Sequence, residues 1–219
     1  MLNLLLLLGS YLLGSIPFGV IVARSKGVDI MAVGSGNIGA TNVYRAVGPG
    51  AAGIVFILDV LKGLIPAFAV TAILKGADWG MYAGIAAVAG HVFSPFLKFK
   101  GGKGIATTLG VLIGVVPIIA ALSLGVFIII VAITRYVSLG AIIAAIVAAS
   151  ACFIQHEPIQ ISVAFALLAI VILLKHIPNM KRLASGTERK FSIKPKTLEQ
   201  APPKEPEEEG PTDSEGGSK

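Results

Sequence analysis

Long apolar runs separated by short polar segments dominate this chain. Six such runs cover residues 2–23, 51–74, 79–97, 105–134, 137–154 and 158–174. Apart from the fourth, each is close to the roughly 20 residues that a helix needs to cross the hydrocarbon core of a bilayer. The pattern predicts an all-α polytopic membrane protein.

The fourth run is longer than one crossing requires. At about 1.5 Å per residue, a single helix over 105–134 would reach about 45 Å, whereas the hydrocarbon core is about 30 Å thick. Pro117 lies near its middle, shortly after Gly114, and an internal proline kinks or breaks a helix. We therefore expect a short limb over 102–116 and a second helix over 118–134, giving about seven short transmembrane helices.

The distribution of charge predicts the orientation. With seven crossings and the N-terminus outside, the basic residues of 24–45, 98–103, 135 and 175–196 all face the cytoplasm, as positive-inside orientation requires. The opposite side then receives only Lys75, Asp78 and Glu157. The C-terminus is expected in the cytoplasm. The first run has no basic leader and no convincing cleavage site, so we interpret it as a retained span.

Composition agrees with this picture and divides the chain in two. Of 219 residues, 55% are hydrophobic and 14% are charged, and the net charge of +6 is concentrated in loops. Membrane lipids and phosphorylated compounds are therefore expected partners, and nucleic acid is not. Residues 1–196 are predicted to form the membrane domain. Residues 197–219, rich in proline and glutamate, are predicted to be a disordered tail or an artificial extension.

The first polar segment, residues 34–45, has the features of a phosphate-binding loop. Glycines let the backbone approach a ligand, short polar side chains supply donors and acceptors, and Arg45 offers a bidentate fork for phosphate. The candidate site residues are Ser35, Gly36, Asn37, Thr41, Asn42 and Arg45. The alternative is a polar turn that caps a helix, with Arg45 as a charge anchor.

The second polar segment, around residues 90–108, contains Phe-Lys-Gly-Gly-Lys-Gly directly before a helix. This arrangement resembles an anion nest, in which consecutive free amides and a helix N-terminus meet a lysine. Its candidate residues are Gly101, Gly102, Lys103 and Gly104, with His91 nearby. It is not a Walker loop, because the required spacing is absent. A glycine-rich hinge with lysines on lipid headgroups is the alternative, and His91 would then be an interior histidine.

The third polar segment follows the last apolar run. His176 and Asn179 flank Pro178 where the chain leaves the membrane, and both can face an interfacial site. Glu188 is expected to orient Arg182, or to form only a surface ion pair that contributes little to stability. Within the apolar runs, Asp59 and Lys62 are three residues apart and are expected to pair; the role of Lys62 stays open.

Several other chemistries lack support in the sequence. Three histidines, one cysteine and few carboxylates form no metal-ligand spacing, so neither a metal nor a cofactor is expected. There is no Gly-x-Ser-x-Gly elbow. The His-x4-Asp base motif of many acyltransferases is also absent, since the fifth residue after His91 is Phe96 and the fifth after His176 is Lys181.

Together, the three segments resemble the bacterial acyl-phosphate-dependent glycerol-3-phosphate acyltransferases, the PlsY family. The resemblance covers nearly all of residues 2–196. It implies an inner-membrane enzyme, active on its cytoplasmic face and expected as a monomer. Such an enzyme transfers a fatty acyl group from acyl phosphate to the sn-1 hydroxyl of glycerol 3-phosphate, giving lysophosphatidic acid and inorganic phosphate.

The resemblance also implies roles for individual residues. Gly101 to Gly104 correspond to the family's glycerol 3-phosphate loop, Ser35 and Arg45 to its essential serine and arginine, and Glu188 to its motif-ending glutamate. We expect Ser35, His176 and Asn179 to be catalytic, with oxyanion donors among Ser35, Asn179 and loop amides. The base is either His176 or, as we favour, a phosphate oxygen of the donor.

Two other functions fit the same features less well. A transporter of a phosphorylated solute would also have many helices and anion-binding loops, but it usually has its site at midmembrane between inverted repeats. No repeat is evident in this sequence. A lipid-binding scaffold without turnover is the third possibility.

Overall fold

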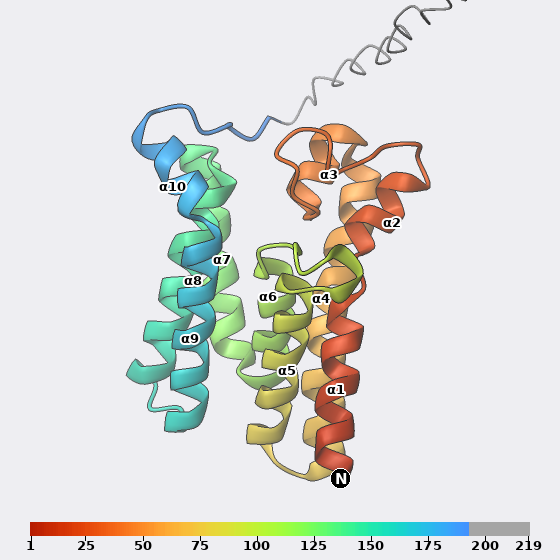
Figure 1. Ribbon diagram of the computed structural model, residues 1–219. Coiled ribbons are helices and arrows are strands. Elements are labelled where there is room, and N and C mark those ends of the chain that lie inside the picture. The colour runs from red at the N-terminus through yellow and green to blue at the C-terminus, as the bar shows by residue number, and fades with distance from the viewer. Residues whose placement is uncertain (193–219) are drawn as a thin grey trace, which may run out of the picture.

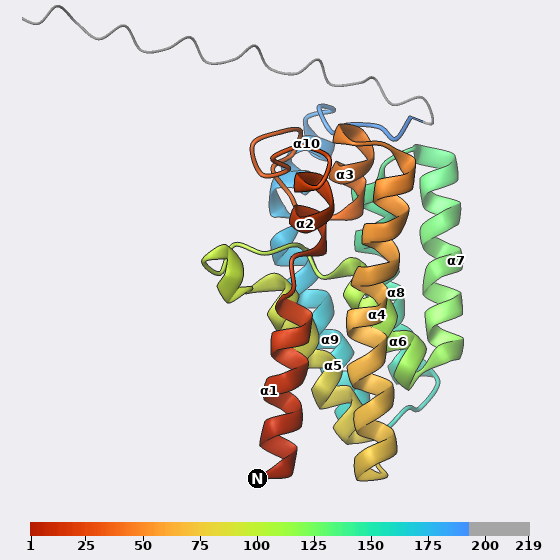
Figure 2. The same cartoon turned by 90° about the vertical axis from the view of Figure 1, so that its right-hand side faces the viewer.

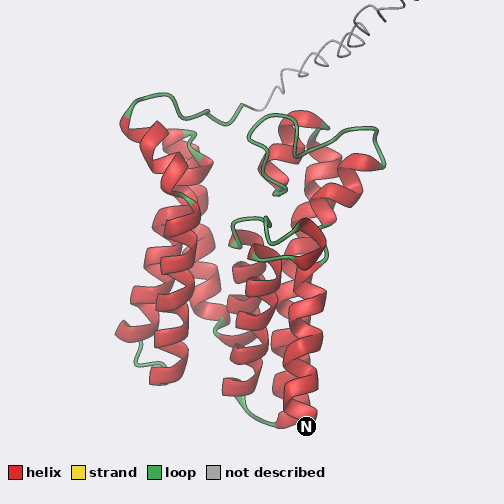
Figure 3. Ribbon diagram, in the orientation of Figure 1, coloured by secondary structure: helices red, strands yellow, loops and turns green. Residues whose placement is uncertain are grey.

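The computed structural model describes residues 1–192, and helices are the only regular structure within that range (Figure 3). The predicted tail at 197–219, and the domain boundary at 196, lie outside the described residues. The predicted all-α class is therefore confirmed for residues 1–192.

The first part of the chain contains six α-helices and one 3-10 turn. These are α1 (Leu2–Ser15), α2 (Phe18–Arg24), α3 (Ala40–Ala46), α4 (Pro49–Leu74), α5 (Ala77–Val92), η1 (Pro95–Leu97) and α6 (Ile105–Val115). The first apolar run is broken at Ile16 and Pro17, because a proline cannot continue the backbone ladder. The Ile16 carbonyl at the break accepts from Lys62 Nζ at 2.9 Å and from the Phe18 amide at 3.1 Å.

The second part of the chain contains α7 (Pro117–Thr134), α8 (Val137–Ile154), α9 (Ile159–Lys175) and α10 (Ile177–Ala184). The expected break at Pro117 is present: Val116 is non-helical, with φ −138° and ψ 72°, and Pro117 is the first residue of α7. The short limb begins at Ile105 and not at residue 102, because residues 101–103 are not helical and the amides of Gly101 and Gly102 bond back to the end of α5.

The helices form two groups that lie side by side in Figure 1, with α1 to α6 on one side and α7 to α10 on the other. Glycines allow close helix contacts in the first group, as expected for membrane helices. A Cβ atom at Gly14 would meet the backbone of Ala87, one at Gly63 that of Thr107, and one at Gly110 that of Val60. Large apolar side chains such as Phe68 and Ile133 are exposed on the outside, where lipid would contact them.

Five helical segments are long and apolar enough to cross a membrane: Leu2–Arg24, Pro49–Leu74, Asp78–Leu97, Pro117–Thr134 and Val137–Ile154. A sixth is α9 with α10, which are bent by 58°. α6 has 11 residues and reaches only about 16 Å, well short of the core thickness. The protein is thus an integral membrane protein with five to six long spans, and the seven crossings remain a prediction.

The three polar segments lie in the half of the bundle away from the N-terminus. Figure 1 and Figure 2 show α2, α3 and α10 at the end opposite the N-terminus, with the connection into α6 below them. The N-terminal end of α6 lies deeper in the bundle than α3 and α10. Segments more than 100 residues apart in the sequence therefore face one another.

Candidate active site

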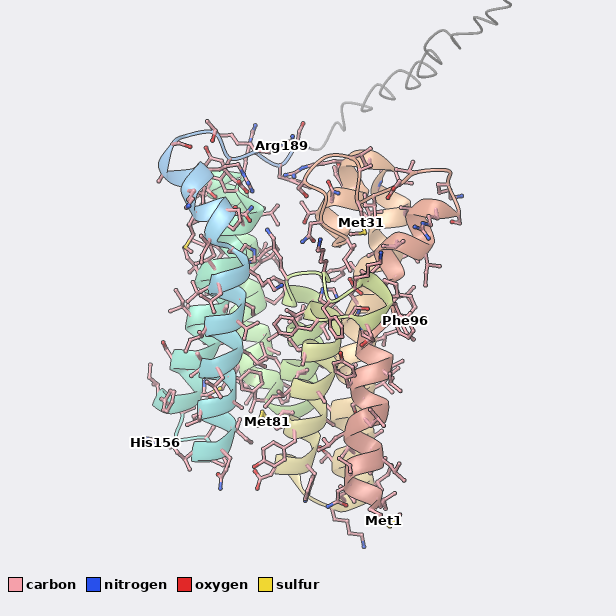
Figure 4. The ribbon with its side chains drawn as sticks, in the orientation of Figure 1. Met1, Met31, Met81, Phe96, His156 and Arg189 are labelled. Atoms are coloured by element: carbon pink, nitrogen blue, oxygen red, sulfur yellow. The ribbon has the colours of Figure 1, made fainter. Side chains whose placement is uncertain are left out.

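A cavity of about 410 Å³ lies where the three polar segments meet. Most of the candidate residues line it: Ser35, Asn37, Thr41, Asn42, Arg45, His91, Lys103, Gly104, His176, Asn179, Arg182 and Glu188. Figure 4 labels Arg189, a further lining residue, on the segment that runs from α10 toward α3. The fold therefore brings all three segments into one site.

Three predicted glycines, Gly36, Gly101 and Gly102, are not among the lining residues. The amide of Gly101 donates to the Val92 carbonyl at 3.2 Å, and that of Gly102 donates to the His91 carbonyl at 3.0 Å. The expected nest of consecutive free amides is therefore wrong for Gly101 and Gly102. These bonds anchor the loop to the end of α5 and place Lys103 and Gly104 at the cavity.

Asn42 organises the first polar segment. It is 2% exposed, and its Nδ2 donates to the carbonyls of Ile30 and Val33, each at 3.1 Å. Its Oδ1 accepts a hydrogen bond from the Ser35 amide at 3.0 Å. Gly34 has φ +63°, and a Cβ there would collide with Asn42 Oδ1. The Asn42 side chain thus holds the loop in shape and has no amide hydrogen left for a substrate.

Asn37 and Arg45 complete the wall formed by this segment. Asn37 Oδ1 accepts a hydrogen bond from the Gly39 amide at 2.9 Å, which closes the turn before α3. Arg45 donates to the Arg189 carbonyl at 3.3 Å, across the cavity mouth. Burial, followed by the nearby Arg189 charge, lowers the pKa of Arg45 from its ordinary value. An anionic ligand would relieve this crowding of positive charge.

Glu188 is the centre of a hydrogen-bond network in the third segment. Its Oε1 accepts from Ser138 Oγ at 2.8 Å and from Asn179 Nδ2 at 2.7 Å, and its Oε2 accepts from Arg182 Nε at 2.7 Å. Burial raises the pKa of Glu188, but these hydrogen bonds outweigh it and hold the pKa below the usual range. Glu188 therefore stays ionised, and it forms the expected ion pair with Arg182.

Lys103 extends this network into the cavity. Its Nζ donates to Asn179 Oδ1, so both ends of the Asn179 amide are engaged. Burial lowers the pKa of Lys103 to about 8, with Glu188 opposing the shift and Arg182 adding to it. Lys103 is thus a cation at neutral pH, and its charge is poorly compensated until an anion binds.

His176 lies at the junction of α9 and α10 and is 3% exposed. Its Nδ1 lies 2.8 Å from the Ile172 carbonyl oxygen, which can only accept, so Nδ1 is the protonated nitrogen. In the neutral ring, Nε2 is therefore left as the acceptor. His176 lines the cavity, so it is a candidate for a base or an orienting group there.

The cavity lining includes three further residues with polar or charged side chains, which the sequence did not single out for the site. Asp59 comes from α4, Ser138 from α8 and Arg189 from the segment after α10. Asp59 forms the predicted ion pair with Lys62, at 2.7 Å. Its position opposite His91, 32 residues later, was not visible in the sequence. Ser138 lies in an apolar run with no motif, so no local signal identified it.

An apolar groove adjoins the cavity. It has a volume of about 90 Å³ and lies between α6, α7, α8 and α9. The groove and the cavity share Phe56, Ile105, Ala106, Phe127 and Ala141. The groove wall on α8 is built from small residues, Ala144, Ala145 and Ala148. A ligand with an anionic head and an apolar chain would match both parts together.

No group of three or more histidine, cysteine, aspartate or glutamate side chains within residues 1–192 is arranged to hold a metal ion. The positive groups at the cavity are instead Arg45, Lys103, Arg182 and Arg189. These side chains are suited to binding phosphate. The lysine would bind it as a point charge, and the arginines would bind it through bidentate hydrogen bonds.

Comparison with known proteins agrees with this geometry. A family model described as glycerol-3-phosphate acyltransferase matches residues 4–186. A protein of that name from Geobacter metallireducens is 50% identical over 192 residues, covering 87% of this chain and 98% of the relative. One from Aquifex aeolicus is 43% identical over 189 residues, covering 86% and 98%.

Two crystal structures of PlsY, an integral membrane glycerol 3-phosphate acyltransferase, have the same fold. The glycerol 3-phosphate form has a TM-score of 0.83 and 42% identity, covering 88% of this chain and 96% of that chain. The lysophosphatidic acid form has a TM-score of 0.81 and 41% identity, covering 88% and 97%.

Proposed function

This chain belongs to the glycerol-3-phosphate acyltransferase family, and from that premise we propose that it transfers a fatty acyl group from acyl phosphate to the sn-1 hydroxyl of glycerol 3-phosphate. The products are lysophosphatidic acid and inorganic phosphate. One observation supports this reaction above all: a cationic cavity opens directly into an apolar groove. Both substrates have a phosphate, and one of them has a long apolar chain.

The phosphate groups would bind among Lys103, Arg45, Arg182 and Arg189. Asn179 and Glu188 would position Lys103 and Arg182, because their hydrogen bonds fix the two cations relative to each other. Asn179 is engaged at both ends, which favours a positioning role over the oxyanion role that the sequence suggested. The acyl chain would lie in the groove, with its carbonyl at the residues shared with the cavity.

The proposed reaction needs no covalent intermediate with the protein. The sn-1 oxygen attacks the acyl carbonyl carbon, the bond from that carbon to the phosphate oxygen breaks, and phosphate leaves with its electron pair. We favour transfer of the hydroxyl proton to a phosphate oxygen of the donor. Ser35 remains the side-chain donor proposed for the developing oxyanion. Alignment of hydroxyl and carbonyl in a fixed site supplies much of the rate.

His176 is the alternative base, and single-turnover kinetics can decide between the two. If the donor phosphate is the base, His176→Ala should lower the single-turnover rate by roughly tenfold, through lost alignment. A loss of many orders of magnitude with unchanged substrate affinity would instead identify His176 as the base.

The reaction can be tested with purified protein and radiolabelled glycerol 3-phosphate. We expect a lipid-extractable product with acyl phosphate as donor, stoichiometric phosphate release, and no product with acyl-CoA. Product only with acyl-CoA would contradict the proposed donor. Binding of glycerol 3-phosphate without any lipid product would contradict an acyltransferase and favour a transporter or a scaffold.

The orientation belongs to the same proposal. We place the protein in a bacterial inner membrane, with the N-terminus outside and the cavity facing the cytoplasm, and count α6 as the short fourth of seven crossings. Basic residues such as Arg24, Lys98 and Arg135 support the assignment of the cavity end. In a Cys152→Ser background, single cysteines at Ser25 and Thr187 should react with an impermeant thiol reagent only from the inside. Cysteines at Lys75 and His156 should react from the outside.

A further inference from the structure

Two buried polar side chains on the cavity wall have no role in the reaction described above. Asp59 on α4 and His91 on α5 both line the cavity, and each side chain is 4% exposed. His91 Nδ1 lies 3.8 Å from Asp59 Oδ1, which is too long for a hydrogen bond. Within residues 1–192, His91 Nδ1 has no hydrogen-bond partner. A buried polar atom without a partner is costly, so this gap points to a ligand.

Neighbouring contacts hold the two side chains in place. Lys62 Nζ lies 2.7 Å from Asp59 Oδ1 and also donates to the Ile16 carbonyl. The His91 carbonyl accepts from the Gly102 amide, and a Cβ at Gly102 would collide with the His91 imidazole ring. The pair is therefore fixed both to the α1 break and to the loop that presents Lys103.

A hydroxyl group that reached both atoms would give each of them a partner. An oxygen about 2.8 Å from each atom can donate its hydrogen to the Asp59 carboxylate and accept from His91 in the tautomer that has its hydrogen on Nδ1. Glu188, the other carboxylate that lines the cavity, already accepts three hydrogen bonds. Beyond the contact of Asp59 with Lys62, the Asp59–His91 pair therefore has capacity to bond a glycerol hydroxyl.

We propose that the Asp59–His91 pair binds the sn-2 hydroxyl of glycerol 3-phosphate and selects the alcohol over the corresponding ketone, dihydroxyacetone phosphate. This inference rests on the proposed function. The ketone oxygen can only accept, so it supplies no hydrogen to Asp59 and places two acceptors against each other. The pair thus distinguishes an alcohol from a ketone at C2.

The position of the groove assigns the sn-2 hydroxyl, and not the reacting sn-1 hydroxyl, to this pair. The sn-1 hydroxyl must meet the acyl carbonyl where the groove joins the cavity, at residues such as Ile105 and Phe127. Asp59 and His91 line the cavity but not the groove. With the phosphate near Lys103, the remaining hydroxyl is the one that can reach the pair.

The test combines a change in the protein with removal of the hydroxyl from the substrate. The acceptors are glycerol 3-phosphate, 3-hydroxypropyl phosphate, which lacks the C2 hydroxyl, and dihydroxyacetone phosphate. For the wild-type protein, we expect kcat/KM to be roughly 100-fold lower with 3-hydroxypropyl phosphate. Asp59→Asn should lower kcat/KM roughly 30-fold for glycerol 3-phosphate but less than about 3-fold for 3-hydroxypropyl phosphate. It should also lower the preference for glycerol 3-phosphate over the ketone at least about tenfold, because an amide can donate to the ketone.

A second pair of variants covers the case in which Asp59→Asn does not fold. His91→Asn keeps a polar group near the Nδ1 position, whereas His91→Leu removes it. The measured quantity is the ratio of kcat/KM for glycerol 3-phosphate to kcat/KM for 3-hydroxypropyl phosphate. We expect His91→Asn to keep at least part of this ratio and His91→Leu to lose it. Equal losses on both acceptors would identify a structural role only and overturn the proposal, as would equal use of both acceptors by the wild-type protein. If no acceptor is acylated at all, the proposed reaction fails, and equilibrium binding of the two phosphates still tests the pair.

Discussion

The amide nitrogen of Asn179 lies 2.7 Å from Glu188 Oε1, and this bond determines which end of the Asn179 amide faces Lys103. Glu188 therefore acts on the cavity through Asn179, without needing to contact a substrate. The carboxylate also holds Ser138 and Arg182, so a single residue connects α8, α10 and the segment after α10.

Replacing Glu188 with Gln should disrupt this network while keeping its shape. The amide cannot accept three hydrogen bonds and no longer balances Arg182, so Lys103 loses its fixed position. We expect kcat/KM for glycerol 3-phosphate to fall roughly 30-fold and the free energy of unfolding to fall by about 2 kcal/mol. Glu157→Gln is the matched control, because Glu157 follows His156 at the opposite end of the bundle (Figure 4). Similar effects in both variants would contradict a role specific to the site.

The charge of Lys103 should give the reaction an alkaline limit. The pKa of Lys103 is about 8 because of burial, so its charge is present below that pH and is lost as the pH rises through it. We expect kcat/KM for glycerol 3-phosphate to decline above about pH 8, since this ratio reports the free enzyme.

The variant Lys103→Arg tests this assignment. A guanidinium stays charged throughout this range, so the alkaline decline should move upward even if the maximal rate falls. An unchanged decline in the variant would assign the titration to another group. A wild-type profile that is flat to about pH 10 would show that the charge of Lys103 is not needed.

Gly34→Ala should damage the first polar segment through the backbone and through Asn42. Gly34 has φ +63°, and an added Cβ would collide with Asn42 Oδ1. We expect a loss of about 3 kcal/mol in the free energy of unfolding, from backbone strain and a broken Asn42 contact, and a raised KM for glycerol 3-phosphate. Gly27→Ala is the control, because Gly27 has φ +74° but nothing within 4 Å of an added Cβ. It should lose only about 1 kcal/mol and keep its KM. Equal losses in the free energy of unfolding in the two variants would contradict the proposal that Asn42 holds this loop in shape.

The apolar groove should set the preference for acyl length. Ala145 lines the groove on α8, so Ala145→Phe should fill part of it. We expect kcat/KM for a long-chain acyl phosphate to fall at least about tenfold, and that for a short-chain donor to change less than about 3-fold. Ile146→Phe places the same ring on the next residue, which is 45% exposed, and should leave the preference unchanged. A uniform loss on both donors would show that the acyl chain does not use this groove.

Sequence patterns alone predicted the helical class, the break at Pro117 and the pairing of Asp59 with Lys62. These features follow from local rules: an apolar run of a given length forms a helix in lipid, a proline interrupts it, and charges three residues apart on a helix are neighbours. The motifs of the three polar segments also indicated the family that the comparisons show.

The hydrogen bonds that each polar atom makes follow from the packing of the helices, which the sequence patterns do not reveal. The sequence offered Gly101 and Gly102 as free amides and Asn179 as an oxyanion donor, yet the fold turns both amides toward α5 and engages both ends of Asn179. The same reason explains why Ser138 and the pairing of Asp59 with His91 were missed. Contacts such as Ser138 with Glu188, 50 residues apart, and Lys103 with Asn179, 76 residues apart, depend on how the helices pack, and no local spacing encodes that packing.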